Sequence, residues 1–155
     1  MSAMSDILAL KNKINTKTLN LILLTIATAG IYQLLWLYRN QSIIGDITKS
    51  KVTDDTFIIW IAVCAGLGGA FSNGDAEFIL ILSVLLSIAS TVLYVIWAFK
   101  ARKSLQNYAL HEFRFKFKMN VFYTIFFNIY YINYCINDLP DAFEKQQILN
   151  GQTTE

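Results

Sequence analysis

Four long apolar stretches divide the chain. They run over residues 18–38, 56–74, 78–99 and 119–137, and none of them contains a charged residue. Each is close to the roughly 20 residues that an α-helix needs to cross a hydrocarbon core about 30 Å thick. The pattern predicts an all-α membrane protein with one membrane domain over residues 18–137, an N-terminal segment over 1–17 and a C-terminal tail over 138–155.

Composition agrees with this class, because 55% of the 155 residues are hydrophobic and only 15% are charged. The lysines before Leu19 and the triplet Ala27-Thr28-Ala29 imitate a cleavable export signal. The apolar run resumes at Ile31, which favours a retained segment. Cys64 and Cys135 lie in apolar stretches without C-x-x-C spacing, so neither a disulfide nor a zinc framework is predicted.

The 13 Lys and Arg residues discriminate between membrane topologies, because positive charges in short loops stay in the cytoplasm. Four crossings with a cytoplasmic N-terminus would leave nine of them outside. The reversed four-span arrangement leaves only four outside, but exports the three lysines of residues 11–17. If the second and third stretches cross while the first and fourth enter and return, all 13 are cytoplasmic. We therefore expect a bacterial inner-membrane protein with both termini in the cytoplasm, and the reversed four-span arrangement remains open.

The first and fourth stretches also resemble each other. When Thr25–Asn40 is set against Thr124–Asn137, Gly30 faces Asn128. Gly and Asn adopt positive φ most readily, so each stretch is interpreted as two half-helices with a break between them. The residues assigned to this break motif are Thr28, Gly30, Tyr32, Trp36, Asn128 and Tyr130. Trp36, Tyr38, Tyr130, Tyr131 and Tyr134 are the expected interface aromatics. The alternative is a chance similarity between two kinked spans.

These residues carry a family resemblance. Thr28-Ala29-Gly30-Ile31-Tyr32 with Trp36 and Tyr38 resembles the T-L-G-I-Y-x-x-x-W-x-Y signature of small bacterial inner-membrane proteins classed only as a domain of unknown function. Tyr131–Leu139 resembles a later Y-L-Q-Y-x-x-N-x-L element of that family. The chain departs from the signature at Ala29, where Leu is usual, and at Asn128, where a Gly is expected. The resemblance implies a multi-helix membrane protein and no activity.

The second and third stretches carry small residues at four-residue spacing, which allows close helix packing in lipid. The predicted packing residues are Ala62, Gly66, Gly69 and Ala70 in one stretch and Ser83, Ser87 and Thr91 in the other. A tight turn composition over residues 72–75 favours an antiparallel hairpin. Self-association through the same faces is the alternative.

A basic segment follows the third stretch, with phenylalanines alternating with cations over residues 113–118. We expect an extended segment on the membrane surface, with its rings toward the bilayer. The candidate headgroup-binding residues are Lys100, Arg102, Lys103, Arg114, Lys116 and Lys118. The alternative is a basic loop that only fixes topology.

No pattern of catalytic or cofactor-binding residues stands out, and we expect neither an enzyme nor a bound cofactor or metal. Asn133, Tyr134 and Asn137 form a polar face within the last apolar stretch. This face is expected to bond opened backbone, or alternatively to line a small pocket. The predicted function is an accessory or scaffold protein that forms a homo-oligomer or joins another membrane protein. An anionic-lipid-binding or membrane-perturbing module and a small channel or facilitator are the alternatives. The predicted partners are membrane lipids and other membrane proteins, and nucleic acid is not expected.

Overall fold

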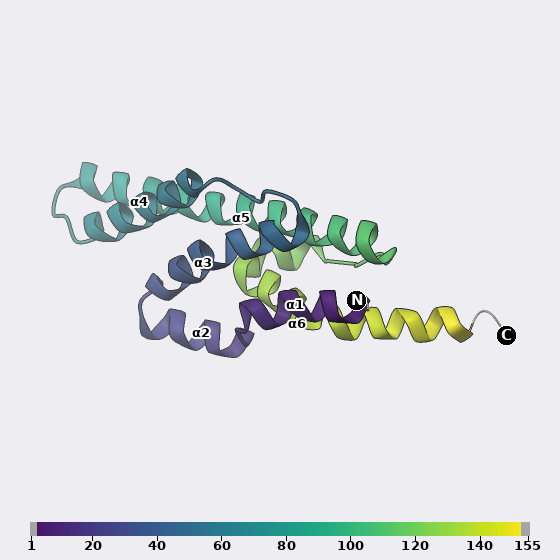
Figure 1. Ribbon diagram of the computed structural model, residues 1–155. Coiled ribbons are helices and arrows are strands. Elements are labelled where there is room, and N and C mark those ends of the chain that lie inside the picture. The colour runs from purple at the N-terminus through teal and green to yellow at the C-terminus, as the bar shows by residue number, and fades with distance from the viewer. Residues whose placement is uncertain (1–2, 153–155) are drawn as a thin grey trace.

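The computed structural model describes residues 3–152, and every regular element in that range is an α-helix (Figure 1). This confirms the all-α prediction. The helices are α1 (Ala3–Ile14), α2 (Thr18–Ala27), α3 (Ile31–Thr48), α4 (Asp55–Phe71), α5 (Glu77–Phe113) and α6 (Val121–Gln152). Residues 1–2 and 153–155 of the predicted terminal segments lie outside the described part of the chain.

Three helices continue well beyond the apolar stretches that begin them. α3 ends at Thr48, α5 at Phe113 and α6 at Gln152. These extensions remain helical because each buries one apolar face against the others, at residues such as Ile44, Leu105 and Leu139. The absence of charge predicts how much of a helix suits a bilayer, and it does not predict where the helix ends.

α4 packs along the first half of α5, and residues 72–76 form the turn between them (Figure 1). α2 folds back along α3 through the turn at residues 28–30. Both turns lie toward the same end of the molecule, at the left of Figure 1, whereas the end of α5 and the C-terminal half of α6 extend to the right. The fold therefore holds two helical hairpins that point in the same direction.

The buried core occupies the end of the molecule opposite these turns. α5 shows the change most clearly, because Phe78 is 74% exposed while Trp97, Ala98 and Ala101 are fully buried. The core also includes Ile7, Leu10, Leu37, Ile44, Leu105, Ile132, Ile136, Leu139 and Phe143. Many apolar residues of α2, the start of α3, α4 and the first part of α5 have the opposite exposure: Leu19, Leu23, Ile26, Ile31, Leu35, Ile59, Trp60, Ile81, Val84, Leu85 and Ile88 are all exposed.

One helix, Glu77–Phe113, is long and apolar enough to cross a membrane within the described residues. Its most apolar window has a mean hydropathy of 2.6, and only 11% of that window is buried in the protein. α4 is a shorter apolar helix. A core helix of a water-soluble protein would bury such a window, so the low burial separates α5 from that class.

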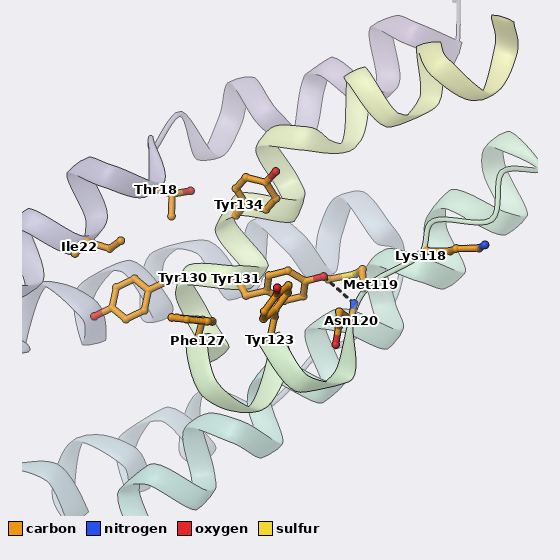
Figure 2. Close-up of a pocket in the computed structure, with 10 residues that line it drawn as sticks. All are labelled: Thr18, Ile22, Lys118, Met119, Asn120, Tyr123, Phe127, Tyr130, Tyr131 and Tyr134. Atoms are coloured by element: carbon orange, nitrogen blue, oxygen red, sulfur yellow. Dashed lines mark hydrogen bonds between the residues drawn. The ribbon is translucent and has the colours of Figure 1, made fainter. Parts of the chain in front are cut away.

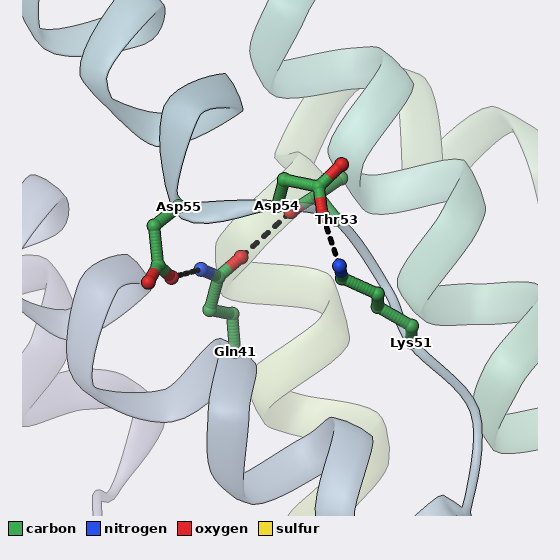
Figure 3. A network of polar contacts seen from close by, with 5 residues as sticks. All are labelled: Gln41, Lys51, Thr53, Asp54 and Asp55. Atoms are coloured by element: carbon green, nitrogen blue, oxygen red, sulfur yellow. Dashed lines mark hydrogen bonds and ion pairs between the residues drawn. The ribbon is translucent and has the colours of Figure 1, made fainter.

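A small polar network fixes the start of α4 against α3 (Figure 3). The buried Gln41 amide donates to Asp55 Oδ1 at 2.8 Å and accepts from Thr53 Oγ1 at 2.6 Å. Beside it, an exposed ion pair joins Lys51 to Asp54, and this hydrogen-bonded partner lowers the pKa of Asp54. The buried Gln41 amide thus connects the α2–α3 hairpin to the start of the α4–α5 hairpin, and both its N–H and its C=O group are hydrogen-bonded.

Candidate functional site

The first turning point is a Schellman-type helix end. Gly30 N–H donates to Thr25 O at 2.8 Å, and Ala29 N–H donates to Ile26 O at 3.2 Å. Gly30 has φ 92°, and Ala29, which carries a Cβ, also has a positive φ, of 49°. The chain therefore reverses through two consecutive positive-φ residues. The sequence indicates the glycine but not the alanine, because Ala rarely takes this conformation.

The Thr28 side chain connects the helices on either side of this turn. Its hydroxyl donates to Leu24 O of α2 at 2.8 Å and accepts from Tyr32 N–H of α3 at 2.9 Å. The backbone N–H groups of residues 28–31 also find acceptors within the chain. Every N–H donor from residue 28 to residue 32 is thus satisfied, which an apolar environment requires.

The second turning point lies inside α6, where Asn128 has φ 26° and ψ −102°. The chain folds back there: Asn120 N–H donates to the Tyr131 hydroxyl at 2.7 Å, and the rings of Tyr123 and Tyr131 are 5.7 Å apart. In a straight helix, residues 120 and 131 would be separated by about 16 Å along the axis. Asn128 is therefore the turning residue of a second, shorter hairpin.

The two turning elements contact each other, since the Tyr130 hydroxyl donates to Gln33 Oε1 at 3.1 Å. Two of the aromatic residues expected at the membrane interface differ in environment. Trp36 is only 3% exposed and packs edge-on against Trp97, with ring centroids 6.3 Å apart. Tyr134 is 53% exposed. The interface assignment of Trp36 is therefore corrected, because α5 covers the indole that α3 presents.

The polar face of α6 bonds to the linker between α1 and α2. Asn133 Nδ2 donates to Thr16 O at 2.9 Å and to Thr18 Oγ1 at 3.1 Å, and Asn137 Nδ2 also donates to Thr16 O at 2.9 Å. Asn133 is fully buried. These two amides therefore satisfy backbone opened between helices, and only Tyr134 of the predicted polar face lines a cavity.

That cavity is an open groove of about 670 Å³ between α2 and α6 (Figure 2). Its walls are Thr18 and Ile22 of α2 and the aromatic residues Tyr123, Phe127, Tyr130 and Tyr134 of α6. Residues 118–120 line one end, where the Lys118 amine points away from the aromatic rings (Figure 2). None of the ten lining residues is acidic. Sequence reasoning missed the groove because it forms only when the two breaks bring α2 and α6 together.

The basic segment has its phenylalanines on the side opposite to that expected. Phe115 and Phe117 are buried in the protein, and Phe115 packs against Phe143 of α6 with centroids 5.9 Å apart. Lys116 and Lys118 are exposed. Residues 114–120 are not helical, and the rings of Phe115 and Phe117 face the core of the protein. The physical reason is that α5 and α6 together offer an apolar surface for the rings.

The other predicted headgroup residues are spread over this basic end. The Arg102 guanidinium donates to Met119 O through Nε at 3.2 Å and Nη2 at 2.9 Å. Lys100 lies over the Phe57 ring, 5.4 Å from its centroid. Lys103 and Arg114 are exposed. Arg102 therefore holds the basic segment against α5, and these cations do not converge on one point.

The packing of α4 on α5 uses only some of the predicted small residues. Ser83 Oγ donates to Gly68 O at 2.7 Å, and a Cβ on Gly68 would lie 2.9 Å from Ser87 Oγ. Gly66 and Gly69 have open space where a Cβ would be. Of the predicted packing residues, Ser83 and Ser87 of α5 make this contact. The others do not take part in it: Thr91 of α5 and Gly66, Gly69 and Ala70 of α4 are exposed, and Ala62 is half-buried. The four-residue spacing identifies a small-residue face without deciding which glycine meets the partner.

Within residues 3–152, no group of three or more His, Cys, Asp or Glu side chains is placed to hold a metal ion. Residues 16–107 match the family model described as a domain of unknown function, DUF4234. The matched range holds α2, α3 and α4 and most of α5, so it contains the first turning point and ends before the second. No curated protein and no solved structure matches the chain.

Proposed function

We propose that this chain, which belongs to the DUF4234 family, is a non-enzymatic integral protein of the bacterial inner membrane that acts as an accessory or scaffold subunit. In this proposal α4 and the apolar half of α5 cross the bilayer. The α2–α3 hairpin and the first part of α6 enter from the cytoplasm and return. Both termini lie in the cytoplasm, and the packed ends of α1, α3, α5 and α6 form a cap there.

The observation that carries the proposal is the change of exposure along α5. Before Trp97 most of its large apolar residues are exposed, whereas Trp97, Ala98, Ala101, Leu105 and Ala109 are buried and Leu110 alone of the later large aliphatic residues is exposed. The cations Lys100, Arg102 and Lys103 follow immediately. Large contiguous apolar surfaces are unfavourable in water and mark a membrane or a protein partner. A bilayer that ends near Trp97 would cover the exposed half and leave the charged half in water.

The scaffold role is supported by the free face of α4. Gly66 and Gly69 are exposed and have no neighbour within 4 Å of an added Cβ, although a helix packed beside them would approach closely. The cytoplasmic cap is held by a buried core, which makes it a rigid platform on the spanning pair. A protein that joins two such surfaces is suited to assembly with a second copy or with a larger membrane complex.

Site-directed labelling tests the topology. In a variant whose two native cysteines are replaced by serine, single cysteines are placed at the exposed positions Asn12, Ser42, Asn73 and Asn107. An impermeant maleimide is expected to label position 73 from outside intact cells and the other three only after the cytoplasm is opened. Labelling of position 12 from outside would instead support the reversed four-span arrangement and contradict the proposal.

Self-association is tested by disulfide crosslinking in native membranes. Copies carrying Gly69→Cys are expected to crosslink with each other. Copies carrying Val63→Cys are the control, because this exposed position lies about 120° away around α4. Equal crosslinking at both positions would indicate random collision. A protein that stays monomeric in membranes and copurifies with no complex would refute the scaffold role.

A further inference from the structure

A second groove, of about 480 Å³, lies between the C-terminal part of α5 and the non-helical chain that follows it. This basic groove is lined by Arg102, Gln106, Asn107 and Leu110 of α5 and by residues 116–119. Three of the predicted headgroup cations, Arg102, Lys116 and Lys118, line it together, and none of its eight lining residues is acidic. The basic groove therefore has the charge to hold an anion.

Hydrogen bonds from α5 fix the geometry of the basic groove. The Arg102 guanidinium donates to Met119 O through Nε and Nη2, and the Gln106 amide donates to Phe117 O at 3.1 Å. Arg102 and Gln106 are one helical turn apart and share a face of α5. Lys118 lies between the two bonded residues, so its backbone is held beside the guanidinium.

The half-buried Arg102 keeps part of its guanidinium free for a ligand. An arginine side chain carries five N–H donors in a planar fork. Met119 O takes the edge formed by Nε and Nη2, whereas Nη1 forms no hydrogen bond with any described group. The edge formed by Nη1 and the second hydrogen of Nη2 can therefore donate two parallel bonds to an oxyanion, which is how guanidinium groups bind phosphate.

The two lysines add flexible positive charge to this fixed group. Lys116 and Lys118 are exposed, and neither forms an ion pair with another described side chain. The Lys118 amine points away from the aromatic rings between α2 and α6, so that groove does not use its charge (Figure 2). One fixed guanidinium and two flexible ammonium groups suit a compact anion with several oxygen atoms, such as a phosphate group.

The proposed membrane placement puts this site among lipid headgroups. In that placement the hydrocarbon core ends near Trp97, and α6 enters it again after Val121. Arg102 lies five residues beyond Trp97, about 7.5 Å along the helix axis, and Lys118 lies three residues before Val121. The headgroup layer is roughly 5–8 Å thick on each side of the core. Arg102 and Lys118 therefore lie where lipid phosphates are concentrated, which favours a lipid over a soluble anion.

We propose that the basic groove binds the phosphate of one anionic phospholipid headgroup in the cytoplasmic leaflet. The free edge of the Arg102 guanidinium donates to two phosphate oxygens, and Lys116 and Lys118 neutralise the negative charge. The acyl chains stay in the surrounding bilayer. The inference rests on the proposed membrane placement, which sets the groove at the headgroup level. The bound headgroup would join α5 to the chain that enters the membrane again.

The test uses the full chain in a mild non-ionic detergent and native mass spectrometry. Dioleoyl-phosphatidylglycerol and dioleoyl-phosphatidylethanolamine are titrated separately, so that the acyl chains match and only the headgroup differs. The wild-type protein is expected to retain one phosphatidylglycerol molecule in preference to phosphatidylethanolamine. In Lys116→Gln/Lys118→Gln, which keeps the structural Arg102, this preference should fall by about fivefold for each lysine removed. A wild-type protein without headgroup preference would overturn the proposal.

The matched control is Lys103→Gln/Arg114→Gln. It removes the same charge from two exposed cations of the same basic end that do not line the groove. Its preference for phosphatidylglycerol should equal that of the wild type. An equal loss in both double variants would reduce the effect to general surface charge and contradict a specific site.

Two further measurements locate the ligand and identify its source. Asn107→Glu places a carboxylate in the groove without removing a cation and should lower the preference, whereas Gln147→Glu adds the same charge at an exposed position of α6 away from the groove and should not. Equal effects would contradict the location. Inorganic phosphate at millimolar concentration should not displace phosphatidylglycerol, and displacement would assign the groove to a soluble phosphate. Lipid retention is measured in detergent and topology by labelling in cells, so failure of one is distinguishable from failure of the other.

Discussion

Replacement of Thr28 by valine tests whether the first turning point depends on its threonine hydroxyl. Valine keeps the β-branched shape but removes the group that donates to Leu24 O and accepts from Tyr32 N–H. Leu24 O keeps a second donor, Thr28 N–H at 3.0 Å. Tyr32 N–H has no other acceptor among the contacts of the turn, so the valine variant leaves a backbone donor unsatisfied.

The size of the effect follows from these two losses. A buried donor without a partner costs about 1–3 kcal/mol, and the lost bond to a carbonyl that keeps another partner costs less, about 0.5 kcal/mol. Side-chain hydrogen bonds in membrane proteins contribute about 0.6 kcal/mol on average, which places the sum toward the lower end. We expect Thr28→Val to lower the free energy of unfolding by about 2 kcal/mol.

The assay is reversible unfolding in mixed micelles, followed by the fluorescence of the buried Trp36–Trp97 pair. Thr91→Val is the matched control, because the Thr91 hydroxyl is exposed and only donates back to Ser87 O of its own helix. It should change stability by less than about 0.5 kcal/mol. Thr28→Ser should recover most of the loss. If Thr28→Val were as stable as Thr91→Val, the hydroxyl would have no role in holding the turn.

Three further predictions concern packing and buried amides. Gly68→Val should lower the free energy of unfolding of the α4–α5 pair by about 1–3 kcal/mol, because the added side chain overpacks the contact with Ser87. Gly66→Val adds its side chain to open space and should leave unfolding in micelles nearly unchanged. Equal effects of the two variants would contradict the observed packing of Gly68 on α5. Gln41→Leu should lower the free energy of unfolding by about 1.5–3 kcal/mol, because the Asp55 carboxylate loses a hydrogen-bond donor. A Leu variant as stable as the wild type would show that the network in Figure 3 does not stabilise the fold. The double variant Asn133→Asp/Asn137→Asp should release the α1–α2 linker, detected as faster proteolysis near Thr16, since neither carboxylate can donate to the Thr16 carbonyl; an unchanged cleavage rate would exclude this role.

The positions of both turning points could be read from the sequence, because Gly30 and Asn128 are the residues least strained at positive φ. The conformation of Ala29 could not, since local propensity argues against it. It is held there by hydrogen bonds on both sides of the turn, which exist only once α2 and α3 are both formed. A tertiary arrangement therefore overrides the preference of one residue.

The limits of prediction elsewhere have a different cause. Charge predicts which part of α5 is apolar, but the burial of Leu105 and Tyr108 that keeps the helix intact to Phe113 depends on α3 and α6. Likewise, alternation in the basic segment predicts two faces without deciding which face meets the protein. A period-two or four-residue pattern predicts which side chains of one element share a face. Which other element that face contacts is decided by the tertiary fold.

The two turning points reach a similar shape with different atoms, and both use the donors of their own broken backbone. At the first, the Thr28 hydroxyl and local carbonyls take every donor from residue 28 to residue 32. At the second, the Asn128 side chain accepts from Ile129 N–H, while Tyr131 and the Asn120 side chain accept from the start of α6. In the proposed membrane placement, a broken helix could bind a ligand only through peptide groups that remain free, and at both breaks the chain uses these groups itself. The breaks therefore shape the fold by bringing α2 against α6, which forms the aromatic groove between them.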